Sequence, residues 1–399
     1  MTTSSTSSSA QCPTPIFDNL DYLKLTPITS NDIKYSIEFL GAYAGSTATF
    51  NAYRREVERL LHWCIEIAHK SVREITRVDF EAFLKFCQNP PKSWIGLKNV
   101  TRFIDKDGAR IPNPEWRPFV VSISKKSFHD GQRPTVDDYL LSQSALQAIF
   151  AITSSFYQYL IQENYAEINP VSQIRQKSQF LRKTQGKKVI RKLSELQWNY
   201  VINTAENMDE RTLFIMNALY SMYLRISELS SSPRWEPQMQ HFYKDGDANW
   251  WFKTVGKGNK ERDIAVSDAM LNALKRYRLS LNLSPLPSPG ESTLLLSKNK
   301  GKGSITGTRH IRKLVQACFD KAATRLAEHN FHEEADQLRC ATVHWLRHTG
   351  ISEDVKIRPR EHVRDDAGHG SGAITDRYID VELRERHASA KNKLIKVPS

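Results

Sequence analysis

The sequence predicts a mainly helical protein of two domains, the second of which carries a small β-sheet. The chain has 399 residues, of which 40% are hydrophobic and 25% are charged. This length is enough for two or three domains that each bury a core. Over residues 31–170, apolar side chains recur at spacings of three and four, as one-sided helices require. Over residues 249–266, two apolar runs flank a glycine-rich turn, which predicts a hairpin.

The first domain is expected to span residues 31–174 and to be helical. Residues 46–69 place their apolar positions on one face and most charged positions on the other. A second helix is predicted in residues 76–87, where Thr76 and Asp79 have capping-box spacing. A third, residues 141–165, ends before the Asn-Pro pair at 169–170.

Other parts of this half show no helical periodicity. Residues 1–30 are rich in Ser and Thr and are expected to form a disordered tail. Residues 88–134 are rich in Pro, Gly and Trp, and we expect a loop or insertion.

A basic linker, residues 175–193, is expected to separate the domains. Like charges repel one another, so this segment should be extended unless phosphates neutralise it. The second domain, residues 194–399, is predicted to begin with a helix capped by Ser194, with Gln197 three residues later. Another helix is expected to run through residues 212–229, and further helices follow the hairpin.

Charge and composition limit the classes of partner. Lys and Arg total 57 against 44 acidic residues, which gives a formal charge of +13. This surplus favours a polyanion, either nucleic acid or an acidic membrane surface. The five cysteines are widely spread and form no C-x-x-C pair, which favours a reducing compartment. No apolar run is long enough to span a bilayer and the N-terminus has no secretory core, so we expect a cytoplasmic protein.

Four separate stretches carry residues that together could bind and attack a phosphate. In YLRISEL, Arg225 precedes Glu228 by three residues, so the pair is expected on one helical face. Lys257 lies between two glycines at the predicted hairpin tip. Taken alone, each stretch is more often an ordinary surface ion pair or an exposed turn.

The other two stretches lie near the C-terminus. In HWLRH, His344 and Arg347 are expected on the same side of a helix, and the arginine should disfavour the charged imidazole. His348 is predicted to be structural. The last stretch gives His369 and, nine residues later, Tyr378. His329 and His332 are spaced like metal ligands but have no acidic or cysteine partner at a recognisable spacing, so we predict neither a metal nor a cofactor.

In this order, these residues resemble the active-site set of the tyrosine recombinases, also called the phage integrase family. LRISEL is similar to the family's first arginine motif, VGKGNKER to its lysine hairpin, HWLRHT to its His-x-x-Arg motif, and GH with a later Tyr to its last motif. The sequence departs from the family at DDAGH, because the stretch before Gly-His is acidic here, whereas the family usually has an apolar residue before Gly-His. The resemblance covers about 200 residues.

The resemblance implies a fold and a reaction. The fold would be a helical, SAM-like core-binding domain followed by a mixed α/β catalytic domain, the two clamping DNA. Tyr378 would attack a phosphodiester and form a 3′-phosphotyrosyl link, without metal or ATP. Arg225 and Arg347 would clamp the non-bridging oxygens, with Glu228 orienting Arg225. His344 would help to accept the tyrosine proton, and Lys257 would protonate the leaving 5′ oxygen. His369 would form a hydrogen bond with the phosphate or in the region of the nucleophile.

The resemblance also implies partners. These would be duplex DNA with specific recombination sites, a homotetramer formed by a dimer on each of two sites, and in some systems an accessory protein, all at the nucleoid. The segment after Tyr378 could dock on a neighbouring protomer. Residues expected to contact DNA are Arg54, Arg55, Arg182, Lys183, Lys187, Lys188, Lys260 and Arg262. Two alternatives stay open: a type IB topoisomerase, or a non-catalytic DNA-binding protein with the same fold.

Overall fold

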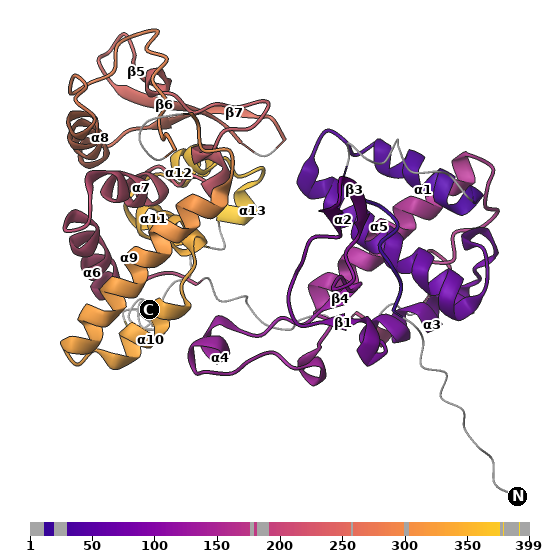
Figure 1. Ribbon diagram of the computed structural model, residues 1–399. Helices are drawn as coiled ribbons and strands as arrows, with labels where there is room; N and C mark the ends of the chain where they lie inside the picture. Colours follow the sequence, from indigo (N-terminus) through magenta and orange to yellow (C-terminus); the bar gives the residue numbers. More distant parts are fainter. Residues whose placement is uncertain are drawn as a thin grey trace, which may run out of the picture. The chain divides into compact units, whose positions relative to one another are not determined.

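The computed structural model describes residues 12–19, 30–175, 179–181, 191–256, 258–298, 303–375, 378 and 391. The chain divides into two compact units, residues 1–186 and 187–399 (Figure 1). The division falls within the predicted linker, much of which lies outside the described residues. Each unit is considered by itself below.

Helices form most of the first unit. They are α1 (Asn31–Gly41), α2 (Thr47–Trp63), α3 (Arg77–Gln88), α4 (Lys125–His129) and α5 (Gln143–Gln162). Shorter helical turns are η2 (Cys64–Ala68), η3 (Val72–Glu74), η4 (Lys92–Trp94) and η5 (Val136–Asp138). The three predicted helices are therefore confirmed as α2, α3 and α5. At α3, Thr76 and Asp79 make both bonds of the capping box, which is worth about 1 kcal/mol.

The region expected to be a loop, residues 88–134, contains short strands as well as turns. Strand β1 (Ile95–Gly96) pairs in parallel with β4 (Phe119–Val120), and β2 (Phe103–Lys106) forms a hairpin with β3 (Ala109–Pro112). The two turn residues of the hairpin are Asp107 and Gly108, both at positive φ, as a tight hairpin turn requires. Trp94 and Phe119 are fully buried, so this region is anchored in the core of the unit.

Residues 12–19 pack onto the rest of the first unit, which differs from the disordered tail that composition predicts for this segment. Phe17 is fully buried. The backbone amides of Ile16 and Phe17 donate to Glu58 Oε1 at 2.6 and 3.1 Å. One apolar anchor and a buried acceptor therefore outweigh the polar composition of the flanking sequence.

The second unit combines helices with one antiparallel sheet. Its helices are α6 (Glu195–Glu206), α7 (Glu210–Ser221), α8 (Asp268–Ser280), α9 (Thr308–Glu328), α10 (His332–Cys340), α11 (Val343–Ile357), α12 (Arg360–Ala367) and α13 (Gly372–Thr375). Two short turns are η7 (Ile226–Leu229) and η8 (Met239–His241). The strands β5 (Phe242–Lys244), β6 (Trp250–Val255) and β7 (Glu261–Ala265) lie in the order β5-β6-β7, which confirms the predicted hairpin. Ser194 and Gln197 form the capping box predicted for α6.

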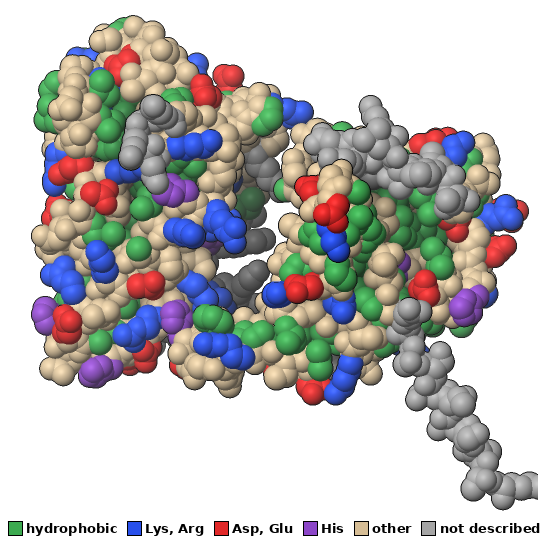
Figure 2. Space-filling view, in the orientation of Figure 1, with side chains coloured by type: hydrophobic (Ala, Val, Ile, Leu, Met, Phe, Trp, Pro, Cys, Tyr) green, Lys and Arg blue, Asp and Glu red, His purple; other side chains and the backbone are tan. Residues whose placement is uncertain are grey.

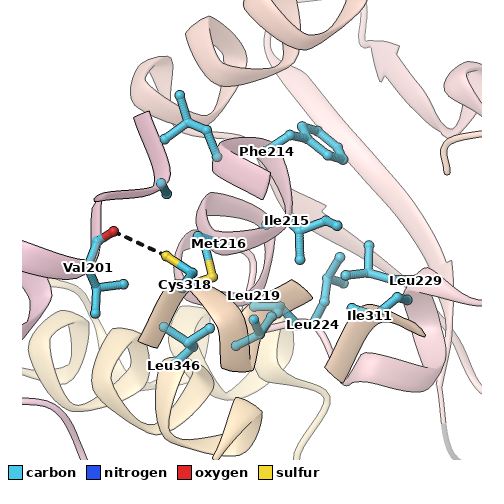
Figure 3. Close-up of a cluster of buried hydrophobic side chains, with 14 of the residues drawn as sticks. Val201, Phe214, Ile215, Met216, Leu219, Leu224, Leu229, Ile311, Cys318 and Leu346 are labelled. Atoms are coloured by element: carbon cyan, nitrogen blue, oxygen red, sulfur yellow. Dashed lines mark hydrogen bonds between the residues drawn. The ribbon is translucent and has the colours of Figure 1, made fainter. Parts of the chain in front are cut away.

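The core of the second unit is built around α7. Figure 3 shows Phe214, Ile215 and Met216 of this helix among side chains from α9 and α11, including Cys318 and Leu346. All of these side chains are 2% exposed or less. Among the described helices of both units, none is long and apolar enough for a bilayer crossing.

The helix predicted through residues 212–229 ends earlier than expected. Helix α7 stops at Ser221, and Tyr223 adopts a left-handed backbone with φ 50°. Arg225 then caps the short turn η7 instead of projecting from a helix. The break is stabilised by Arg347, which donates to the Tyr223 carbonyl, so a contact distant in sequence overrides the local apolar pattern.

Candidate active site

A cavity of about 730 Å³ in the second unit gathers most of the predicted catalytic residues. It is lined by residues from the turn after α7, the β6–β7 hairpin, α11 and the segment after α12. The predicted residues among them are Arg225, Lys260, Arg262, His344, Arg347, His369 and Tyr378. On the face of this unit drawn in Figure 2, basic and acidic side chains are interspersed. The cavity therefore stands out by its composition, because it brings three guanidinium groups together.

Helix α11 supplies His344, Arg347 and His348 from one and a half turns. The Arg347 side chain is buried, 2% exposed, and its Nη2 donates to the Ala367 carbonyl at 2.6 Å. Its Nη1 donates to the Tyr223 carbonyl. Arg347 therefore joins the end of α12 to the turn after α7, while still lining the cavity.

Arg225 is held by a carboxylate three residues away. Its backbone amide donates to Glu228 Oε2 at 2.8 Å and its Nη1 to Oε1 at 3.1 Å. The side chain remains 29% exposed, and Nη2 donates to the Gly368 carbonyl at 3.4 Å. Arg225 is thus oriented on one side and open to the cavity on the other, as an anion-binding group should be.

The same carboxylate binds a second arginine. Arg262 of β7 donates to both oxygens of Glu228, at 2.9 and 2.8 Å, and its Nε donates to the Asp366 carbonyl at 2.9 Å. Burial alone would raise the pKa of Glu228, but the hydrogen bonds and charge of Arg262, with a smaller contribution from Arg225, lower it. Gly256 packs closely against this network. A Cβ atom added at Gly256 would lie 2.8 Å from Arg262 Nη1, which is too close.

The segment after α12 carries His369. Gly368 ends α12 in the left-handed region, φ 61°, where its close approach to Arg262 leaves little space for a side chain. His369 Nδ1 is 2.9 Å from Thr375 Oγ1 of α13. Of the two acidic residues before this glycine, Asp366 has a structural explanation, because it is 6% exposed and forms an ion pair with Arg358 at 2.6 Å.

Tyr378 lies at the wall of the cavity. Its side chain is 9% exposed, and its ring stacks on that of His369 with centroids 5.7 Å apart. Its hydroxyl is 2.6 Å from Nδ1 of His348. His348 in turn contacts the ring of His344, with centroids 4.3 Å apart.

The electrostatics of the cavity favour neutral histidines. Burial, and after it the charge of Arg347, lowers the pKa of His369 to about 4. Burial, followed by His344 and Arg347, lowers the pKa of His348 to about 4. The pKa of His344 is lowered by burial, Arg347 and Arg225, and burial lowers that of Arg347 to about 10. The cavity can therefore bind an anion with its arginines and accept protons with its imidazoles.

Several predicted residues are not brought to this cavity, or lie outside the described residues. Five of them lie outside the described residues: Lys257, Arg182, Lys183, Lys187 and Lys188. Within the first unit, Arg54 donates to the Asp18 carbonyl, and burial lowers its pKa to about 10. Arg55 is 47% exposed and pairs with Glu56. Across the described residues, no cluster of His, Cys, Asp and Glu side chains could hold a metal ion.

Two positions have contacts that the sequence did not indicate. His348, which we expected to be structural, contacts the hydroxyl of the candidate nucleophile. Arg262, which we expected to contact DNA, has its guanidinium engaged by Glu228 and is 10% exposed. The sequence signal for His348 was its position one residue after Arg347, but only the fold places Tyr378 beside it.

Comparison with known proteins gives one consistent answer at the level of sequence. No family model matches the chain. Tyrosine recombinase XerC of Haemophilus ducreyi is 27% identical over 259 residues, which cover 62% of this chain and 74% of that protein. Tyrosine recombinase XerD of Rickettsia prowazekii is 32% identical over 126 residues, which cover 31% of this chain and 39% of that protein.

Solved structures agree at the level of the fold. XerH recombinase, in a post-cleavage complex with a palindromic difH substrate, is 13% identical, with TM-score 0.55 over 93% of this chain and 92% of its own. A lambda integrase dimer bound to a COC′ core site is 12% identical, with TM-score 0.51 over 92% of this chain and 79% of its own. The chain is therefore similar in sequence to proteins named tyrosine recombinases, and it has the fold of solved recombinase and integrase structures.

Proposed function

We propose that this protein is a site-specific DNA recombinase that cleaves and rejoins duplex DNA through a covalent link to Tyr378. The observation that carries the proposal is the cavity lined by Tyr378, His344, His369, Arg225 and Arg347. A tyrosine near two guanidinium groups and neutral imidazoles fits attack on a phosphodiester better than it fits passive binding. The relatives named tyrosine recombinases support the same reaction.

The reaction would use the site in defined roles. Tyr378 Oη attacks the phosphorus, a 3′-phosphotyrosyl link forms, and a 5′-hydroxyl leaves. Arg225 and Arg347 bind the non-bridging oxygens, whose charge grows in the five-coordinate transition state. Lys257 is the proposed acid for the leaving oxygen. The phosphotyrosyl link keeps the energy of the broken bond, so rejoining needs no ATP.

Glu228 would set the position of Arg225 without touching DNA. It is 2% exposed and accepts from both the backbone and the side chain of Arg225. Arg262 neutralises the same carboxylate, so Arg225 keeps excess positive charge for a phosphate. Two arginines around one buried carboxylate therefore leave a net positive charge, and Arg225 is held in a fixed orientation toward the cavity.

Partners and location are proposed with the reaction. The natural partner is duplex DNA that carries a recombination site, with a dimer on each site and a tetramer across two sites. The two units would clamp the duplex, an accessory protein could assist assembly, and the protein would act at the nucleoid in the cytoplasm. A mobile element is the proposed context, through its integration, excision or resolution.

The test is covalent capture of DNA. The full chain is incubated with a library of nicked duplexes that have a random central segment, and adducts that survive detergent are recovered and sequenced. We expect one enriched sequence class with the wild type and no adduct with Tyr378→Phe. An adduct that persists in Tyr378→Phe would identify another nucleophile, and a wild type without any adduct would leave a non-catalytic DNA-binding protein.

A second assay separates recombination from relaxation. Two copies of the recovered sequence are placed on one supercoiled plasmid, and the products are separated by size. We expect deletion or inversion of the segment between the copies. Relaxation without recombinant products would instead identify a topoisomerase of the same residue set.

A further inference from the structure

The imidazole of His348 contacts the hydroxyl oxygen of Tyr378, which is the proposed reacting atom. The Nδ1–Oη distance of 2.6 Å is that of a strong hydrogen bond. The two rings are tilted at 39° with centroids 5.3 Å apart, so the contact is made edge-on by the nitrogen rather than by stacked faces. His344, to which the family resemblance assigns the proton, is exposed and lines the cavity from the preceding turn of α11.

The direction of this hydrogen bond follows from the protonation states. A phenol keeps its proton near neutral pH, whereas a neutral imidazole has one nitrogen that accepts. With its own proton on Nε2, His348 accepts from the Tyr378 hydroxyl at Nδ1. The surroundings favour the neutral ring, because burial, His344, Arg347 and His369 all lower the pKa of His348.

The positive charges near His348 also make the basicity of its imidazole depend on whether a phosphate is bound. Arg347 is buried in the same cluster, and His344 and His369 add to the field in their charged forms. A phosphodiester bound between Arg225 and Arg347 brings a negative charge that offsets these guanidiniums. The imidazole then becomes a stronger base once a phosphate is in place.

We propose that His348 is the base that accepts the Tyr378 proton during DNA cleavage. The Oη–P bond forms as the bond from phosphorus to the 5′ oxygen breaks, and the phenol proton passes to Nδ1 of His348. A separate acid, for which Lys257 is the candidate, supplies the proton to the leaving oxygen. In rejoining, each proton returns by the same path. This inference rests on the proposed function, and it leaves His344 to contact the phosphate.

The test compares two replacements at His348 on the DNA duplex recovered by covalent capture. In His348→Asn, the amide oxygen can still accept from the Tyr378 hydroxyl but cannot take up a proton at neutral pH. In His348→Leu both abilities are lost. We expect both variants to slow adduct formation about 100-fold at neutral pH. An Asn variant close to the wild-type rate would reduce His348 to a positioning residue and overturn the proposal.

Two controls keep folding and function separate. His332→Asn makes the same change at an exposed position of α10, and we expect the wild-type rate. Both His348 variants, combined with Tyr378→Phe, should bind the duplex non-covalently as Tyr378→Phe alone does. If the wild type itself forms no adduct, the proposed function is at fault, whereas a wild type that reacts beside unaffected His348 variants contradicts only this inference.

The pH dependence gives a readout that a structural role would not change. Without a base, the rate depends on the fraction of phenolate, so the His348→Asn rate should rise about tenfold per pH unit below the phenol pKa. The wild-type rate should change little between about pH 6 and about pH 9. A difluorotyrosine at position 378, with its lower phenol pKa, should restore much of the Asn variant's loss. A wild-type rate that itself rises tenfold per unit would exclude His348 as the base.

Discussion

Glu58 in the first unit and Glu228 in the second are both buried and paired with arginine, but their surroundings differ. In the first unit, Glu58 is 1% exposed, accepts from two backbone amides and pairs with Arg102. Arg102 also donates to the Phe17 carbonyl at 3.1 Å and lies over the Trp116 ring at 4.6 Å. In the second unit, Glu228 pairs with two arginines that line a cavity, and Arg225 is the more exposed of the two, 29% against 10% for Arg262.

The difference shows that a buried ion pair can either hold two segments of the chain together or help to form an anion-binding site. Around Glu58, the backbone amides of Ile16 and Phe17 and the ion pair with Arg102 hold residues 12–19 against α2. Around Glu228, the positive charge exceeds the negative charge, and Arg225 is oriented toward the cavity. The surplus positive charge around Glu228 lies at a cavity, where it is available to an anion.

The largest effect is expected at Arg347. Replacing it by Lys keeps the charge but cannot bridge the Tyr223 and Ala367 carbonyls while binding two phosphate oxygens. We expect adduct formation to slow by about 1000-fold. The measurement is the single-turnover rate on the captured duplex. Arg339→Lys, in a surface ion pair of α10, is the matched control and should react normally. A rate within tenfold of wild type would mean that only charge matters at this position.

The next effect is on stability and tests the first network. Glu58→Gln leaves Arg102 buried without its carboxylate, which should cost about 3 kcal/mol of unfolding free energy. Hydrogen exchange of the α2 and α3 amides should report it without contribution from the second unit. Glu66→Gln, exposed on η2, should change stability by less than about 0.5 kcal/mol. Equal protection in the two variants would show that Glu58 does not hold two segments of the chain together.

A smaller effect, dependent on pH, is expected at His62 in the first unit. Burial lowers the pKa of His62 to about 3 from an ordinary value of 6.5. The unfolded state therefore binds the proton first, and stability is full above pH 6.5 and falls as the pH drops towards 3. Between pH 6.5 and about pH 5 the loss should be about 2 kcal/mol.

Replacing the ring separates this effect from that of the carboxylates. In His62→Leu, urea unfolding of the first unit at the two pH values should differ by about 2 kcal/mol less than in the wild type. His129→Leu, exposed on α4, serves as the control. Identical pH profiles for wild type and His62→Leu would contradict the assigned burial.

The smallest effect is expected from Glu228→Gln. The amide can still hold the backbone of Arg225 but loses the charge that orients both guanidiniums. We expect about a tenfold slower adduct formation, because an orienting partner contributes less than the group that it orients. Arg262→Lys should show a similar loss, and the double variant should lose less than the product of the two. Additive losses would mean that the two contacts act independently.

The sequence was most reliable where local patterns decide the structure. The capping pairs Thr76–Asp79 and Ser194–Gln197, the helices α2, α3 and α5, and the hairpin β6–β7 follow from short-range spacing. The order of the motifs was also enough to collect residues that the fold brings to one cavity, from Arg225 to Tyr378. Local interactions set these features because their partners are only a few residues apart.

Other features required contacts between distant segments. The end of α7 at Ser221 depends on Arg347, more than a hundred residues later, and the docking of residues 12–19 depends on Glu58 of α2. Periodicity contains no information on either contact, so it predicted a longer helix and a free tail.

The helical architecture, the hairpin and the residue types of the candidate site could be read from the amino-acid sequence. The folded structure was needed to show which imidazole contacts the Tyr378 hydroxyl and which arginine side chain is more exposed to the cavity. His344 and His348 are equivalent as residue types in a basic helix, and Arg225 and Arg262 both resemble surface cations. Burial and the position of one carboxylate or one phenol distinguish them, because hydrogen bonds and charge act over a few ångströms between segments far apart in the chain.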